Sequence, residues 1–503
     1  MPVKKRGPGA SDCFIGEAHA IPFRRARKVK APSRLCRNHF REEECMGKRK
    51  QQKGEKVTSH FEHLNPHAAG IDVGSRSHFV AVPEDADEKP VREFSCFTGD
   101  LYRLAKWLHA CGVKTVAMES TGVYWIPVFE ILEHEGFEVR LVHAHHVKNV
   151  PGRKTDVSDC QWLQRLHSYG LLEGAFRPPE QVCILRSYIR QRMTLARYAA
   201  SHIQHMQKAL SQMNLLLHNV VSDITGMTGM RIIKAILAGE REPLALAGLR
   251  DPRCKNSAAT IARSLEGHYK SEHLFSLKQA VELYEFYQAK IADCDHQIEE
   301  QLALFDDRSA GGEIPPSRRG KSESNGPGFN VREDLYRMTG VDLTRIEGID
   351  SYTALKVVSE VGTDMNRWRS SKQFASWMGL CPGNKVSGGK NLSGKTKRVA
   401  NRAAIALRLA AYGLHKSKSA LGAYYRRQRA RLGAPKAITA TAHKLARLIY
   451  SMLKHGTQYV DAGQDYYEKC YRTRVVENLQ KRATELGFTL VKATFPSPKM
   501  CAT

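Results

Sequence analysis

The 503-residue chain lacks several features that would place it in a membrane or outside the cell. No run of about 18 apolar residues occurs, so no transmembrane helix and no membrane partner are expected. Residues 1–20 are basic but have no apolar core of the kind that secretory signals carry. None of the 12 cysteines forms a Cys-x-x-Cys pair, which favours a reduced, cytoplasmic protein. Cys36, His39 and Cys45 match no common zinc spacing.

Acidic residues are also missing from one long segment. Residues 381–450 contain 16 Lys and Arg and no Asp or Glu, and residues 1–66 contain 16 against 7. The remainder is nearly neutral, although the whole chain carries a net charge of +27. Such an excess indicates a polyanionic partner, either nucleic acid or an anionic membrane. Since a solvated surface usually mixes both signs, we expect nucleic acid to contact 381–450.

Composition and periodicity divide the chain into segments of an α/β plus α protein. The predicted segments are a basic irregular arm (1–66), an α/β domain (67–182), a helical coiled-coil region (183–306), a flexible linker (307–332), a mainly helical C-terminal domain (333–460) and a C-terminal helix and tail (461–503). Within the arm, Met46 is an alternative start position that the sequence leaves open.

The α/β prediction rests on three β-rich runs followed by alternating helix and strand patterns, which indicate a mixed sheet. In the coiled-coil region, apolar residues recur at steps of three and four, and Gln207 and Asn214 interrupt them as register-setting residues do. This pattern predicts two long helices that form an antiparallel hairpin or an oligomerising coiled coil. An ordinary helical core fits either helix alone equally well.

Four carboxylates stand at unusual positions in the α/β domain. Asp72 lies inside the apolar strand Gly-Ile-Asp-Val-Gly, where an unpaired carboxylate is costly. Glu119 follows the strand 113–118, at a carboxyl end where α/β folds place ligand groups. Asp156 and Asp159 share one face at the start of a helix, although helix capping alone would also account for that pair.

Taken together, the four acids indicate a metal site. Carboxylates that converge at one sheet edge repel each other without cations, and oxygen ligands suit Mg²⁺ or, as an alternative, Mn²⁺. Two such ions activate a nucleophile and stabilise the leaving oxygen in phosphodiester chemistry.

The C-terminal domain contains a Gly-rich basic loop at 381–398 before a helix predicted near 399–413. Ser387 and Ser393 are equal candidates for a nucleophile on residue type, and a passive phosphate-binding loop fits as well. Residues 343–363 resemble a helix-hairpin-helix, or equally a plain helical hairpin in a core. The expected nucleic-acid contacts are Lys385, Lys390, Lys395, Lys397, Arg398, Arg402, Tyr424, Tyr425, Arg426 and Arg427, of either DNA or RNA, with helix packing as the alternative for the tyrosines.

These motifs, in this order, resemble those of the DEDD transposases of the insertion sequence 110 family, and the long coiled region resembles its 1111 subgroup. The resemblance rests on Gly-Ile-Asp-Val-Gly, Met-Glu-Ser-Thr-Gly-Val-Tyr-Trp, Lys-Thr-Asp-Val-Ser-Asp and Ser-Gly-Gly-Lys, and it runs from about residue 64 to about residue 450. The arm and the linker are not part of it.

The resemblance implies a RuvC-like ribonuclease-H fold in which Asp72, Glu119, Asp156 and Asp159 bind metal. It also implies a C-terminal transposase domain whose serine nucleophile is Ser387. Family members use a non-coding bridge RNA that pairs with donor and target double-stranded DNA. They act as homotetramers, dimers of dimers with active sites shared between subunits, in the prokaryotic cytoplasm at the nucleoid.

The expected function is therefore an RNA-guided transposase or recombinase that excises and inserts its own element. A metal-dependent junction endonuclease that uses water is the alternative that needs the same acids without Ser387. A non-catalytic nucleic-acid-binding protein needs neither the acids nor the serine.

Overall fold

The computed structural model describes residues 63–120, 122–142, 156–317, 325–397 and 401–491. Most of the predicted basic arm, including Met46, Cys36, His39 and Cys45, lies outside these ranges, as does Arg398. No helix in the described ranges is both long enough and apolar enough to cross a membrane.

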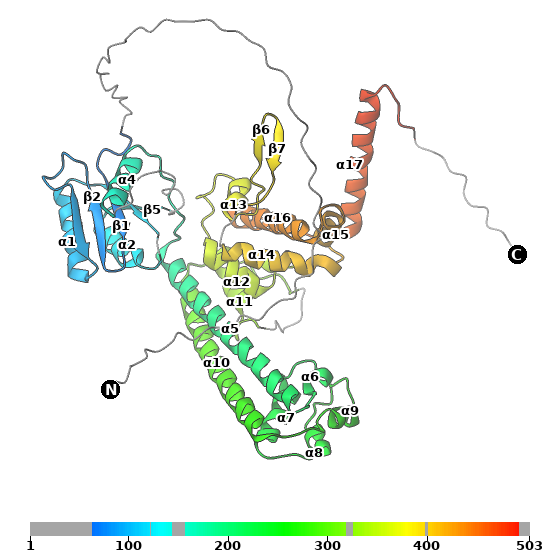
Figure 1. Cartoon of the computed structure of the whole chain (residues 1–503). Coiled ribbons are helices and arrows are strands. Elements are labelled where there is room, and N and C mark those ends of the chain that lie inside the picture. The colour runs from blue at the N-terminus through cyan, green and yellow to red at the C-terminus, as the bar shows by residue number, and fades with distance from the viewer. Residues whose placement is uncertain (1–62, 121, 143–155, 318–324, 398–400, 492–503) are drawn as a thin grey trace, which may run out of the picture. The chain divides into compact units, whose positions relative to one another are not determined.

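The N-terminal domain is built on a five-stranded mixed sheet, as the sequence predicts (Figure 1). Its strands are β1 (Ala68–Val73), β2 (Ser77–Ala81), β3 (Val91–Ser95), β4 (Thr115–Glu119) and β5 (Glu138–Val142), arranged in the order β3-β2-β1-β4-β5. The pairs β1–β2 and β2–β3 are antiparallel, whereas β1–β4 and β4–β5 are parallel.

Alternate residues of β1 pack on opposite faces of this sheet, as the period of two in a strand requires. Ala69, Ile71 and Val73 face a core shared with α1 (Thr98–Ala110) and α2 (Trp125–His134). The other face of the sheet is covered by α4 (Asp156–Ser168), which contacts β1, β2 and β4. The domain therefore has three layers, with α4 alone on the second face among the described helices.

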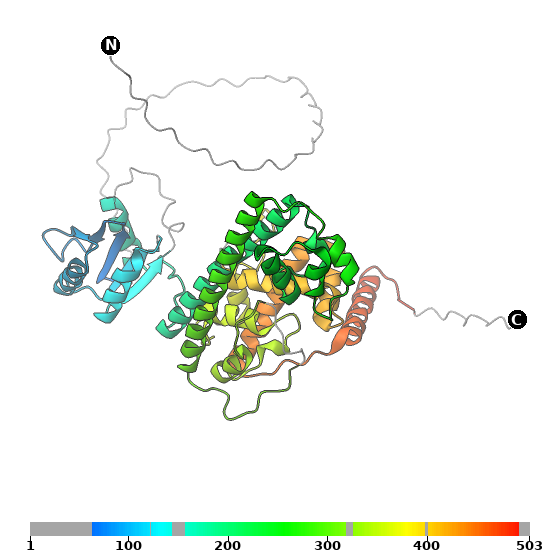
Figure 2. The same ribbon diagram turned by 90° about the horizontal axis from the view of Figure 1, so that it is seen from below.

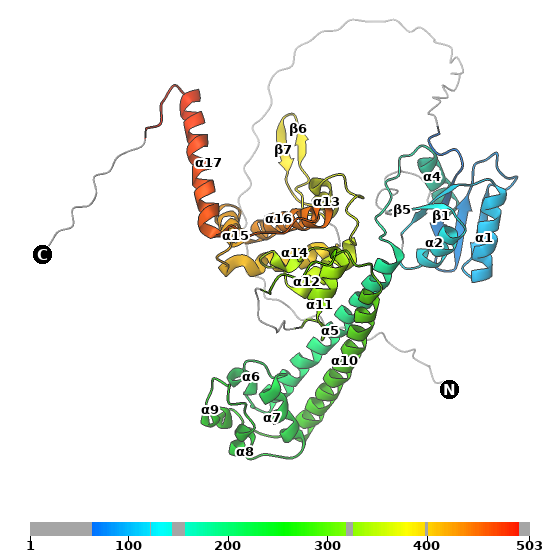
Figure 3. The same cartoon turned by 180° about the vertical axis from the view of Figure 1, so that it is seen from behind.

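The central region is an antiparallel pair of long helices, α5 (Glu180–Gln212) and α10 (Ser271–Ala303), which lie side by side in Figure 2. Four short helices cap their far end (Figure 3): α6 (Leu217–Val220), α7 (Met227–Leu237), α8 (Pro243–Gly248) and α9 (Ala258–Arg263). The cap has its own core, which includes Met206 and Leu277 of the long helices. The alternative of a hairpin within one chain is thus confirmed.

The buried stripe of α5 includes Ile189, Met206 and Leu210. Ala199 is buried and Ala200 is exposed, and Gln207 points to solvent instead of setting the register. The polar residue that lies in the seam is Arg192, which is 4% exposed. Its Nε lies 2.5 Å from Asp295 Oδ1 of α10, so a buried ion pair joins the two helices.

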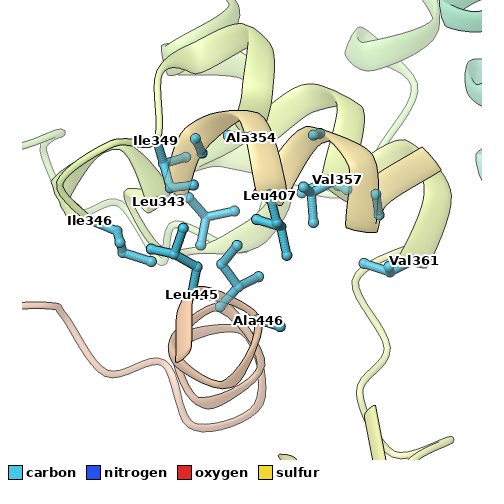
Figure 4. Close-up of a cluster of buried hydrophobic side chains, with 14 of the residues drawn as sticks. Leu343, Ile346, Ile349, Ala354, Val357, Val361, Leu407, Leu445 and Ala446 are labelled. Carbon is cyan, nitrogen blue, oxygen red and sulfur yellow. The ribbon is translucent and has the colours of Figure 1, made fainter. Parts of the chain in front are cut away.

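The C-terminal domain is helical, and its core also contains the near ends of α5 and α10. Its helices are α11 (Val331–Thr339), η1 (Leu343–Arg345), α12 (Ser351–Val361), α13 (Ser371–Trp377), α14 (Arg402–Gly413), η2 (Leu414–Lys416), α15 (Ala420–Leu432) and α16 (Ala434–His455). Figure 4 shows Leu407 of α14 meeting Val357 of α12 and Leu445 of α16. The last helix, α17 (Gly463–Glu485), has no buried residue.

Two predictions for this domain need correction. The segment 381–398 contains a β-hairpin of β6 (Lys385–Ser387) and β7 (Lys390–Ser393) rather than only a loop. The helix-hairpin-helix prediction required two short helices within 343–363, yet the first of these is a three-residue 3₁₀ turn. The second, α12, is capped by Asp350 Oδ1, which accepts a hydrogen bond from Thr353 N at 2.6 Å.

Candidate functional site

Two of the predicted acids are placed on one face of the sheet by local packing. The β1–β4 register pairs Gly70 with Ala117 and Ile71 with Met118, so one further step sets Asp72 beside Glu119. Ala117 packs with Leu163 of α4. Because every second residue of a strand shares a face, Asp72 and Glu119 lie on the side of the sheet that α4 covers.

Gly70 lets α4 approach β1 backbone to backbone. A Cβ at this position would lie 2.3 Å from Gln164 N and 2.4 Å from Cys160 O, closer than a side chain tolerates. The Gln164 side chain also donates to Ala68 O at 3.3 Å, and Asn65 donates to His167 O at 2.8 Å. Helix α4 therefore runs antiparallel to β1, and its N-terminus, with Asp156 and Asp159, lies toward the carboxyl ends of the strands.

The pKa of Cys160 reflects the negative charge at this end of the sheet. Its thiol is fully buried and lies 3.1 Å from Val157 O. Burial, with smaller contributions from the negative charges of Asp72 and Asp159, raises the pKa of Cys160 to about 12. Asp72 and Asp159 thus act on the same buried group. The cysteine itself stays a protonated thiol, which makes it unsuited to be a nucleophile.

The four carboxylates share this region without forming an assembled metal cage. Asp72, Glu119 and Asp159 are half-buried and Asp156 is exposed. Across the described ranges, no group of three or more His, Cys, Asp or Glu side chains is close enough to hold a metal ion. An all-carboxylate donor set nevertheless suits Mg²⁺ or Mn²⁺, which prefer oxygen ligands.

Sequence reasoning missed Gly70, Cys160 and Gln164, which position this site. A signal for Gly70 was available, because a glycine in the middle of a strand often marks a close approach of another backbone. Nothing in the sequence pairs Gly70 with Cys160, 90 positions away in the chain.

Ser387 lies at the tip of the β6–β7 hairpin, directly before its turn. Gly388 and Gly389 both have positive φ, +52° and +74°, as a two-residue type I′ turn requires. Ser387 pairs with Lys390 across the hairpin, so the two side chains share one face. Lys385 lies two residues earlier on the same strand, where the register of the hairpin shifts. The Ser387 hydroxyl is exposed, and so is Lys390 opposite it.

The second serine, Ser393, occupies a different place. It ends β7 opposite Lys385, at the base of the hairpin, where the register shifts by one residue. Its Oγ accepts a hydrogen bond from Lys395 N at 3.3 Å. Lys395 and Lys397 are exposed in the segment that follows. The two serines, equal on residue type, are therefore distinct in position and bonding.

The predicted contacts on α15 are largely used in packing. Tyr425 is 1% exposed and belongs to the C-terminal core, so the prediction that it contacts nucleic acid is corrected. The ring of Tyr424 faces the Lys444 ammonium at 4.7 Å. Arg426 donates to Ser417 O at 2.6 Å, and Arg427 stacks on Tyr471 of α17 at 3.2 Å. Two adjacent residues on a helix point about 100° apart, so one tyrosine of such a pair is usually buried.

Two protein-family models match the chain, one over the N-terminal domain and α5 and one over part of the C-terminal domain. Residues 69–215 match the model of the DEDD transposases of IS110, and residues 342–426 match the model of the IS116/IS110/IS902 transposase family. The first match covers the carboxylate face and α5, and the second covers α12, the hairpin and α14. No curated protein matches the chain. Both models describe one kind of transposase and match in order along the sequence, so residues 69–215 and 342–426 are similar to the IS110 family of transposases.

Proposed function

We propose that this transposase joins DNA strands through a covalent serine intermediate formed by Ser387. The observation that carries the proposal is the position of Ser387, exposed directly before a two-residue turn with Lys390 across the ribbon. A serine hydroxyl is a weak nucleophile, and cationic neighbours stabilise the negative charge that develops on a phosphate under attack.

In the proposed reaction, Ser387 Oγ releases its proton to water and bonds to a DNA phosphorus. The bond from that phosphorus to one deoxyribose oxygen breaks, and this oxygen takes up a proton and leaves as a hydroxyl. A hydroxyl of the strand to be joined then attacks the phosphoserine and restores Ser387. One phosphodiester is exchanged for another, so no external energy source is required.

The acids would serve the same reaction in a RuvC-like ribonuclease-H domain. Asp72, Glu119, Asp156 and Asp159 would hold divalent ions, with Mg²⁺ preferred, and bound ions would supply Lewis-acid stabilisation of the phosphate oxygens. The mixed sheet and the common face of these acids support this assignment.

The finer features of the family complete the proposal. The substrates are the double-stranded ends of an insertion element and its target, a non-coding bridge RNA selects them, and the active form is a homotetramer. The acid-free block 381–450 supports nucleic acid as the partner. A structured non-coding stretch beside the gene, complementary to the element's boundary, would test the guide.

Trapping of the protein–DNA adduct tests the serine. Incubation with element-end DNA and Mg²⁺, followed by denaturing electrophoresis, should give an adduct with the wild type and none with Ser387→Ala. Ser393→Ala, the matched control in the same hairpin, should keep the adduct. An adduct or recombination with Ser387→Ala would overturn the assignment, and cleavage without any adduct would favour the water-using endonuclease.

The acids are tested in the same assay. Asp159→Asn and Glu119→Gln should remove the adduct while DNA binding persists, and a chelator should do the same to the wild type. Glu173→Gln changes an exposed acid of the same domain and should have no effect. If the protein binds DNA but shows no metal-dependent cleavage under any condition, the alternative of a non-catalytic nucleic-acid-binding protein is favoured.

A further inference from the structure

A cluster of arginines lies where α5 passes the C-terminal end of α12. Arg190 binds Glu360 with two hydrogen bonds, of 2.9 and 2.7 Å, and Arg186 donates to Glu360 O at 2.7 Å. About two helical turns further along α5, Arg197 follows Arg190 by seven residues and therefore shares its face. Arg197 donates only a long bond, 3.4 Å, to Thr194 Oγ1 among the described residues.

Helix α14 brings a further arginine to the same place. Gly348, which precedes α12, lies against Ala410 and Leu414 at the end of α14, so the two helices run antiparallel. The end of α12, with Glu360, therefore lies near the start of α14, where Arg402 is the first residue. Arg402 is exposed and makes no ion pair within the described part of the chain.

This arrangement is electrostatically unfavourable in the free protein. Desolvation lowers the pKa of Arg402, and the charges of Arg190 and Arg197 lower it further against the opposing effect of Glu360. A cation at the first residue of a helix also meets the positive end of the helix dipole. Among the described residues, the carboxylate of Glu360 pairs with Arg186 and Arg190 but with neither Arg197 nor Arg402, and α5 as a whole contains a single acid, Glu180. Like charges kept together in this way are stabilised when an anion binds between them.

We infer that Arg190, Arg197 and Arg402 form a binding site for the phosphodiester backbone of a nucleic acid, at the junction of the helical hairpin with α14. The inference rests on the proposed function only in taking nucleic acid as the ligand. Arg197 and Arg402 face the ligand, and Arg190, held by Glu360, is the fixed member.

The experiment measures binding of the full chain to a mixed-sequence DNA duplex and to a single-stranded RNA over a range of salt concentrations. The variant Arg197→Gln/Arg402→Gln leaves Arg190 and its pair with Glu360 intact. Loss of two phosphate contacts should reduce the slope of log K against log salt by about 1.8 for duplex DNA or about 1.4 for RNA. The probe whose slope changes, duplex DNA or single-stranded RNA, identifies which backbone the site binds.

The control, Arg231→Gln/Arg263→Gln, removes the same charge from exposed arginines of α7 and α9 and should leave both slopes unchanged. Thermal unfolding of the free protein gives a second readout. Since the substitutions relieve repulsion, the midpoint for Arg197→Gln/Arg402→Gln should equal or exceed that of the wild type. Binding with an unchanged slope, or a loss of stability in place of a loss of binding, overturns the inference alone. A wild type that binds neither probe overturns the proposed function as well.

Discussion

At the scale of single residues, His167 is a buried histidine of α4 that packs against the sheet on the face with the carboxylates. Its side chain is 0% exposed, and Nε2 lies 2.9 Å from Thr115 Oγ1 at the start of β4. Burial, together with the positive charge of Arg140 and against the opposing effect of Glu138, lowers the pKa of His167 to about 4. The neutral ring therefore helps to seat α4 on the sheet.

His167 makes stability depend on pH. The unfolded chain takes up this proton near pH 6.5 and the folded chain only near about 4, so protonation favours unfolding. The contribution of neutral His167 to the free energy of unfolding should be complete above about pH 6.5 and be lost as the pH falls toward about 4. Urea unfolding should show this loss in the wild type and a flatter profile in His167→Gln. His134→Gln, an exposed control, should follow the wild type, and an unchanged profile in His167→Gln would contradict the prediction.

Single residues also show what sequence could and could not predict. A carboxylate inside an apolar strand is anomalous by itself, which is why Asp72 stood out. Arg192 gave no such signal, because its partner Asp295 is 103 positions away and an arginine on a helix is ordinarily solvated. Long-range pairs of this kind depend on tertiary packing, which periodicity does not encode.

At the scale of elements, Gly70 governs how closely α4 approaches β1. Gly70→Ala would force backbone atoms of α4 away from the strand, because the new Cβ would lie 2.3 Å from Gln164 N. We expect a lower thermal midpoint and loss of adduct formation, since Asp159 moves with the helix. Circular dichroism and the trapping assay measure the two effects.

Gly99→Ala is the matched control for Gly70→Ala. Gly99 lies in α1 with nothing within 4 Å of a new Cβ, and alanine in a helix gains roughly 0.5–1 kcal/mol over glycine. This variant should be as stable as the wild type or slightly more so. Equal effects of the two substitutions would show that close packing at Gly70 is not the cause.

The elements also differ in how well sequence predicts them. The sheet, α1, α2 and the two long helices were predicted because their apolar periods are regular. The β6–β7 hairpin was missed because strands of three and four residues, rich in Lys, Ser and Asn, carry no apolar alternation. The Gly-Gly pair that its turn requires was interpreted as part of a loop that approaches a phosphate, although it equally marks a type I′ turn.

At the scale of the whole molecule, Arg192 ties the helical hairpin to the C-terminal domain. Besides Asp295 of α10, its guanidinium donates to Asn325 O at 3.2 Å and to Gly326 O at 2.8 Å, and it stacks on Tyr352 of α12 at 4.8 Å. One side chain thus joins the two long helices, the described end of the linker and α12.

Removing Arg192 should therefore loosen this attachment. Arg192→Met leaves Asp295 without its partner, and breaking a buried pair in this way costs roughly 3–5 kcal/mol. Arg197→Met, the same change on the exposed face of α5, should leave thermal stability unaltered. Arg192→Met/Asp295→Leu should recover part of the loss. If the single and double variants unfold alike, the ion pair is not what holds the helices.

The two long helices have a consequence for spacing. Each has 33 residues, or about 50 Å at ~1.5 Å per residue, and each end is anchored in a different core. The number of residues in the two helices therefore sets the distance between those cores. Inserting one heptad into each helix would lengthen it by roughly 10 Å and leave both cores unaltered.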